Sequence, residues 1–61
     1  MDRLFITKSK SDFERIIKYI KDNGGEIIQA IGDDWHCAFM IQYKYNKYIK
    51  IDLYGKIQEV D

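Results

Sequence analysis

Alternation of apolar and polar side chains is the pattern that most limits the fold of this chain, and it runs from Trp35 to Leu53. Odd-numbered positions are apolar from Trp35 to Tyr43 and again from Ile49 to Leu53. A period of two is typical of β-strands, whose successive side chains point to opposite faces of a sheet. The pattern predicts a hairpin of two antiparallel strands whose odd-numbered residues form an apolar face.

The loop between these strands sets their register. A two-residue turn at Asn46-Lys47 suits the chemistry of Asn, but it places the second apolar set opposite Lys44, Gln42 and Met40. A three-residue loop, residues 45–47, places that set opposite Tyr43, Ile41 and Phe39 instead. A shift of one residue sends every side chain to the other face, so burial of the apolar set outweighs the turn preference. We therefore predict the loop 45–47.

One amphipathic helix is predicted after the first strand. Phe13, Ile16, Ile17 and Ile20 fall at i, i+3, i+4 and i+7, which is one apolar stripe. Ser11 with Glu14 forms a capping-box pattern at its start, and Ser9 with Asp12 is a competing cap. Asn23-Gly24-Gly25 ends it, with Gly24 suited to the left-handed position.

Three further strands complete the prediction. The first, residues 3–7, is apolar on both faces, which suggests an interior strand. Residues 26–31 precede a turn at Gly32-Asp33-Asp34, which would place Ile31 opposite Trp35, Gln29 opposite Cys37 and Ile27 opposite Phe39. A turn at Gly55-Lys56 leads to a short last strand, residues 57–60, that pairs Ile51 with Val60. We predict a single α+β domain over residues 1–61: one helix packed on one face of a mainly antiparallel sheet of four or five strands, in the order β-α-β-β-β with an optional final β.

Length and charge narrow the function classes. A chain of 61 residues buries only about 60% of the surface that its unfolded form exposes, so a partner is a natural source of added stability. Ten basic and ten acidic side chains cancel, which does not favour nucleic acid or an anionic membrane as the partner. One Cys allows no disulfide within the chain. One Cys and one His are too few for a metal site to be favoured, so we expect no metal and no cofactor. Without a signal peptide or a membrane span, the expected location is the cytoplasm.

The predicted register leaves a second sheet face away from the helix, and its centre is apolar or aromatic. Such a face usually marks an interaction site. The residues that we expect to bind a partner there are Ile28, His36, Met40, Lys44, Tyr48, Lys50 and Tyr54. Tyr and Met are favoured at the centres of protein interfaces. Bases of single-stranded nucleic acid could also stack on Tyr48 and Tyr54, with Lys44 and Lys50 at the phosphates.

His36 is the one side chain that could serve as a general base near neutral pH without a perturbed pKa. Asp33 and Asp34 stand close enough in sequence to orient its ring. No second catalytic group is identifiable, so a surface His after an acidic turn is the favoured interpretation. Alternation points Cys37 away from His36, and Cys37 is expected to be a small core residue.

A family resemblance also concerns His36. A helix, then N-G-G, a strand, and Gly32-Asp33-Asp34-Trp35-His36 entering a longer strand resembles the small HicA-type toxin ribonucleases, over about residues 11–45. The resemblance implies a catalytic His at the head of a strand and RNA as the substrate. In this chain three residues separate the glycine from His36, a strand precedes the helix and the chain is not basic.

The sequence as a whole favours a non-catalytic protein-protein interaction module that binds another protein, or a second copy of itself, through the open sheet face. A small regulator or inhibitor, of the kind that phages or mobile elements encode, fits this size and an Ile- and Lys-rich composition without Pro. The alternative is a HicA-like ribonuclease or a binder of single-stranded nucleic acid that uses His36, Tyr48, Tyr54, Lys44 and Lys50.

Overall fold

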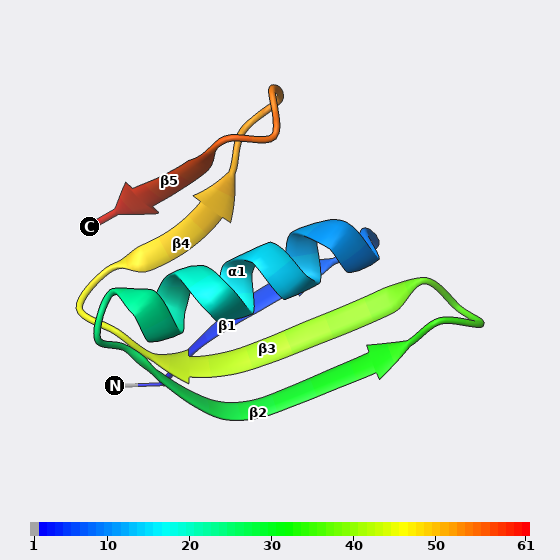
Figure 1. Ribbon diagram of the computed structural model, residues 1–61, viewed down its shortest axis with the longest axis horizontal. Helices are drawn as coiled ribbons and strands as arrows, with labels where there is room; N and C mark the ends of the chain where they lie inside the picture. The colour runs from blue at the N-terminus through cyan, green and yellow to red at the C-terminus, as the bar shows by residue number, and fades with distance from the viewer. Residues whose placement is uncertain (1) are drawn as a thin grey trace.

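The computed structural model describes residues 2–61 and has one helix packed against an antiparallel sheet (Figure 1). The sheet contains three strands in the spatial order β1 (Asp2–Thr7), β3 (Ala38–Lys44) and β2 (Glu26–Asp33), and the helix is α1 (Lys10–Asp22). The last strands, β4 (Tyr48–Ile51) and β5 (Ile57–Val60), form a separate two-stranded antiparallel ribbon. The predicted α+β class, with the element order β-α-β-β-β-β, is confirmed.

The position of β1 explains the main difference from the predicted topology. β1 pairs with β3 from Asp2 opposite Lys44 to Thr7 opposite Phe39, so it occupies the edge of β3 that the prediction assigned to β4. β1 and β2 are both antiparallel to β3, which makes them parallel to each other with β3 between them, a split β-α-β arrangement. The predicted β3–β4 hairpin is therefore wrong.

After β3 the chain instead continues past β1 through residues 45–47, and β4 begins on the far side of β1. The side chain of Arg3 in β1 holds this connection, because its Nε donates a hydrogen bond of 2.9 Å to the backbone carbonyl of Tyr45. β4 then lies beside β1, and Figure 1 shows the β4–β5 ribbon on the side of α1 away from β2.

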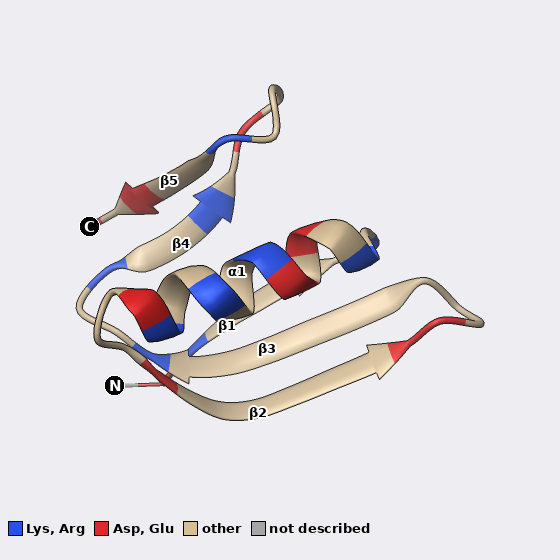
Figure 2. Ribbon diagram, in the orientation of Figure 1, with Lys and Arg blue, Asp and Glu red and all other residues tan. Residues whose placement is uncertain are grey.

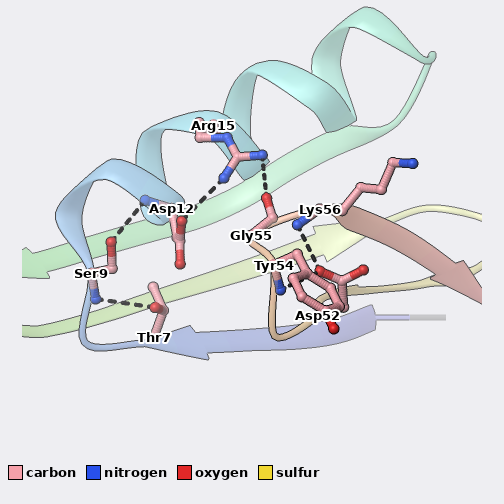
Figure 3. Close-up of polar contacts among 8 residues, drawn as sticks. All are labelled: Thr7, Ser9, Asp12, Arg15, Asp52, Tyr54, Gly55 and Lys56. Carbon is pink, nitrogen blue, oxygen red and sulfur yellow. Dashed lines mark hydrogen bonds and ion pairs between the residues drawn. The ribbon is translucent and has the colours of Figure 1, made fainter.

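The helix begins with the second of the two candidate caps. Ser9 is the N-cap residue, and its hydroxyl accepts a hydrogen bond of 3.2 Å from the backbone N–H of Asp12 (Figure 3). The capping box at Ser11 does not form, because Ser11 already lies inside the helix. The apolar stripe is confirmed, with Ile16 and Ile20 fully buried against the sheet. Gly24, with φ of +86°, ends the helix as predicted.

A small core lies between α1, the sheet and β4. Its buried side chains are Ile16, Ile20, Phe39, Ile41, Tyr43 and Ile49. The odd-numbered residues of β3 thus face the helix as predicted, and Ile49 joins them from the ribbon. Trp35 and Leu53, which were expected to face the helix, are 88% and 98% exposed because both lie in turns beyond the strand ends.

A β-bulge in β2 corrects the predicted register of that strand. Ile27 lies opposite Tyr43 but Gln29 lies opposite Gln42, so Ile28 is one extra residue in β2. Beyond the bulge the alternation is reversed, and Ile31 lies opposite Met40 on the side away from α1. The predicted pairing of Ile31 with Trp35 is wrong, and so are the pairings of Gln29 with Cys37 and of Ile27 with Phe39. The turn comprises residues 34–37 instead of 32–34.

The β4–β5 ribbon exists as predicted but in another register. Ile51 pairs with Ile57, not with Val60, and the turn contains residues 52–56 instead of Gly55-Lys56 alone. The Asp52 carboxylate accepts hydrogen bonds of 2.9 Å from the backbone N–H groups of Tyr54 and Lys56 (Figure 3). These bonds satisfy two backbone N–H groups within the five-residue turn.

Candidate protein-binding surface

The side of the three-stranded sheet away from α1 carries a row of apolar side chains. Ile6 of β1 lies opposite Met40 of β3, which lies opposite Ile31 of β2. Leu4 lies two residues from Ile6 on the same side of β1. Leu4, Ile6 and Ile31 are 57%, 71% and 48% exposed, and Met40 at the centre is partly buried. We call Leu4, Ile6, Ile31 and Met40 the open face.

β1 supplies half of the open face, and this explains why the strand is apolar on both sides. Phe5 points toward the core and packs against it, whereas Leu4 and Ile6 point to solvent. The expectation of an interior strand is wrong, because β1 forms its ladder of backbone pairs with β3 and lies at the edge of the three-stranded sheet. The alternation in β1 is therefore the sequence signal of the open face: its even-numbered apolar residues point to solvent and not to a second buried layer.

Polar residues border the open face at one end. Gln42 and Gln29 lie in the row next to Met40, and the Gln42 amide donates a hydrogen bond of 3.0 Å to Asp2. The last row consists of Asp2, Lys44 and Glu26, one on each strand. An apolar centre with a polar border is the usual layout of a protein interface.

The structure places the seven predicted partner-binding residues in three regions. Met40 and Lys44 lie on the side of the sheet away from α1, and Ile28 is 40% exposed in the bulge of the neighbouring strand. His36 lies in the β2–β3 turn, not in a strand. Tyr48, Lys50 and Tyr54 belong to the β4–β5 ribbon, which leaves the three-stranded sheet because β1 separates β4 from β3. The single surface that was predicted therefore does not form.

The two tyrosines that were expected to stack on a partner differ in their surroundings. The guanidinium carbon of Arg3 lies 4.1 Å from the ring centroid of Tyr48, in a cation-π contact that occupies one face of the ring. Tyr54 is 93% exposed in the turn of the ribbon. Neither residue belongs to the three-stranded sheet that carries the open face.

His36 forms a pair with Asp33 in the β2–β3 turn. The His36 Nδ1 lies 2.7 Å from one Asp33 carboxylate oxygen, and the other oxygen accepts a hydrogen bond of 3.2 Å from the His36 backbone N–H. The bond to the His36 ring, followed by the backbone bond, lowers the pKa of Asp33. Both side chains are exposed, so this pair chiefly holds the turn. Cys37 is exposed as well, with φ of +49°, and its expected place in the core is wrong.

Other sites for chemistry have little support among residues 2–61. That part of the chain contains no cluster of three or more His, Cys, Asp or Glu side chains that could hold a metal ion. A shallow hollow of about 240 Å³ lies between α1 and the ribbon, smaller than the roughly 300–1,000 Å³ of typical ligand pockets. Its lining residues are Arg15, Lys18, Tyr19, Asp22 and Ile57.

Within residues 2–61, no helix has both the length and the apolar character needed to cross a membrane. No family model matches this chain, and no curated protein or solved structure matches it either.

Proposed function

We propose that this chain is a non-catalytic protein-binding module that docks the open face onto another protein. The observation that carries the proposal is the row formed by Ile6, Met40 and Ile31 across all three strands, with two of its three side chains about half or more exposed. Burying such side chains gains roughly 1.5–3 kcal/mol each when they are fully covered. A partner surface that covers this row is therefore favoured over water.

The occupant that best fits the open face is one amphipathic helix of the partner. The opposite face of the same sheet is covered by a single helix, α1, of 13 residues. Three strands spaced about 4.8 Å apart form a face about 14 Å wide, which one helix of roughly 10–12 Å diameter with its side chains covers in large part. A partner helix with an apolar stripe at the spacing of Phe13, Ile16, Ile17 and Ile20 would match the open face as α1 matches the core.

The charges around the open face favour protein over nucleic acid. Lys44 is the cation in the last row on the open side of the sheet, and it lies between Asp2 and Glu26 on the neighbouring strands. Figure 2 shows the same mixture of signs at this end of the sheet. A nucleic-acid surface needs several cations that meet phosphates. A module of this kind acts by covering a surface of its partner, which is how a small regulator or inhibitor works.

The test compares one face variant with a matched control. Ile6→Lys places a charge in the open face, and Leu53→Lys places the same charge at a 98% exposed apolar position in the ribbon turn. Each immobilised protein is exposed to lysate of the native host, and a protein captured by the wild type is then purified and titrated by calorimetry. We expect Ile6→Lys to weaken its binding on the order of ten-fold or more, and Leu53→Lys to leave the affinity unchanged.

Two results would overturn the proposal. One is a purified partner that binds Ile6→Lys as tightly as it binds the wild type. The other is equal loss in both lysine variants, which would point to a general effect of added charge. Far-UV circular dichroism of both variants establishes that they are folded.

A further inference from the structure

The outer edge of β2 is an unpaired strand edge. β2 forms backbone pairs with β3 on one side, and its other side is the end of the three-stranded sheet. The opposite end of the sheet is different, because β4 lies beside β1 and the Arg3 guanidinium packs on the Tyr48 ring. Of the two ends of the three-stranded sheet, the β2 end is the one that other strands leave uncovered.

Apart from the bulge at Ile28 and a charged residue at each end, β2 lacks the features that usually protect such an edge. It is the longest strand, with eight residues, and every side chain from Ile28 to Asp33 is exposed. It contains no Lys, Arg or Pro, the residues that natural edge strands use against pairing with another chain. Figure 2 shows charge only at its two ends, which are Glu26 and Asp33. The last strand of the ribbon, β5, differs from β2 because it has only four residues and one of them, Glu59, is charged.

The bulge limits where a new strand could pair. Regular alternation in β2 begins after Ile28, so the segment available for pairing is Gln29 to Asp33. The middle residue of that segment is Ile31, which belongs to the open face. Because the bulge bends the strand and increases its twist, pairing is confined to these five residues.

We propose that two copies of this chain pair antiparallel through Gln29–Asp33 of β2, with Ile31 of one copy opposite Ile31 of the other. In this register Ala30 of each copy lies opposite Gly32 of the other, and Gln29 lies opposite Asp33. No two like charges then face each other within the paired segment, and an amide meets a carboxylate. Glu26 lies outside the segment, beside Lys44 of its own chain.

A second copy is the favoured occupant of the β2 edge because the segment Gln29–Asp33 is self-complementary in this register, with no like charges opposed. Pairing also enlarges the open face, which is small in one copy. Three strands of about six residues present a face of about 14 by 20 Å, or roughly 300 Å², whereas a standard interface buries about 800 Å² on each partner. A two-fold axis perpendicular to the sheet keeps both open faces on the same side. The paired molecule has one continuous six-stranded sheet, a doubled face and both helices on the other side, and twofold dimers are the commonest oligomers. The use of the doubled face rests on the proposed function, whereas the pairing itself does not.

Disulfide trapping tests the register directly. In a Cys37→Ser background, Ile31→Cys places two thiols opposite each other at the axis, where the Cα atoms of an antiparallel pair lie about 4.5–5.5 Å apart, within the range for a disulfide. Gln29→Cys is the matched control on the same strand, because its two copies lie four residues apart along the pairing. Ile6→Cys reports contact between two open faces instead. We expect a dimer mass for the wild type by sedimentation, and an oxidised covalent dimer for Ile31→Cys alone.

Each other outcome contradicts the pairing through β2. A wild type that sediments with the monomer mass of 7.3 kDa at all concentrations rules out the dimer. A covalent dimer for Ile6→Cys but not for Ile31→Cys assigns the contact to the open faces, and equal trapping of Gln29→Cys and Ile31→Cys shows random collision. None of these results depends on a partner protein, so failure of the dimer is distinguishable from failure of the proposed function.

Discussion

The hydroxyl of Tyr43 accepts a hydrogen bond of 2.9 Å from the backbone N–H of Ile49, inside the core. Tyr43 is fully buried in β3, and Ile49 is 4% exposed in β4. β3 and β4 share no ladder of backbone pairs, so this side chain takes the place of the hairpin hydrogen bonds that a direct β3–β4 contact would supply. The ribbon is thus joined to the sheet through a buried polar contact.

Replacing Tyr43 with Phe tests this contact. The ring remains, but the Ile49 N–H loses its acceptor in a buried position, and an unsatisfied buried donor costs roughly 1–3 kcal/mol. We expect the free energy of unfolding, measured with urea, to fall by about that amount. Tyr54→Phe removes a hydroxyl from a 93% exposed side chain and should leave stability within about 0.5 kcal/mol of the wild type. Equal stabilities for the two variants would show that the buried bond contributes nothing.

Glu59 makes a second link between the ribbon and the rest of the chain. One of its carboxylate oxygens accepts hydrogen bonds from the hydroxyls of Tyr19, at 2.5 Å, and Tyr45, at 2.8 Å. These two bonds, the Tyr19 bond first, lower the pKa of Glu59. The Glu59 bond likewise raises the pKa of Tyr19 to about 12 and raises that of Tyr45.

The direction of the pH dependence follows from these shifts. A carboxylate with a lowered pKa in the folded state stabilises the fold above its ordinary pKa, near 4.5, and the contribution is lost as the pH falls below that value. A phenol with a raised pKa contributes fully below pH 10, and its contribution is lost as the pH rises toward about 12. We expect Glu59→Gln to reduce both the acid-side and the alkaline-side loss of unfolding free energy, measured by urea titration across these ranges. A variant whose pH profile parallels that of the wild type at both ends would contradict this link.

Local patterns predicted the helix, its glycine end and the buried face of β3, because each depends on neighbours within a few residues. The place of β1 depends instead on which strand pairs with the second edge of β3. Phe39, Ile41 and Tyr43 present the same apolar face whether that strand is β1 or β4. The alternation in β4 also suits that edge, and β4 follows β3 directly in the chain. The sequence therefore predicted β4 beside β3, whereas the structure has β1 there.

The bulge at Ile28 explains the rest of the difference at the candidate surface. One extra residue reverses every later side chain of β2, which moved Ile31 onto the open face and Ala30 away from it. The run Glu26-Ile27-Ile28-Gln29 has no glycine to signal a bulge. The position of Met40 was predicted correctly because β3 is regular. Tyr48 and Tyr54 are not on the predicted face because β4 and the turn after it belong to the β4–β5 ribbon.

Gly25 has a packing role beyond the end of the helix. A Cβ atom built on Gly25 would lie 2.5 Å from the Cγ2 of Ile20 and 3.1 Å from the backbone carbonyl oxygen of Lys44. Gly25→Ala should therefore force the chain apart between α1 and β3, and overpacking of this kind costs about 1–3 kcal/mol. Gly24→Ala meets no atom within 4 Å, and its cost of roughly 1–2 kcal/mol comes from the left-handed backbone alone.

A further substitution at Ile20 distinguishes the steric clash at Gly25 from the backbone strain at Gly24. Because the Gly24 strain is local and the Gly25 clash involves the Cγ2 methyl of Ile20, removing that methyl by Ile20→Leu should recover part of the Gly25→Ala loss, in a urea-based double-mutant cycle. The same Ile20→Leu change should give no recovery for Gly24→Ala, whose added Cβ meets no atom within 4 Å. Recovery in both pairs, or in neither, would contradict the close approach at Gly25.

Trp35 provides a direct optical test of the turn that replaces the predicted strand, because it is the only Trp in the chain. Alternation alone predicted an indole packed against the helix, whereas the structure places it 88% exposed between Asp33 and Cys37. A buried indole is shielded from dissolved quenchers, and an exposed one is not. We expect acrylamide to quench Trp35 in the folded protein nearly as strongly as in the urea-unfolded chain. We also expect Asp33→Ala, which removes the acceptor of the His36 N–H, to leave that accessibility unchanged. Weak quenching that becomes strong only on unfolding would return Trp35 to the core and remove the turn at residues 34–37.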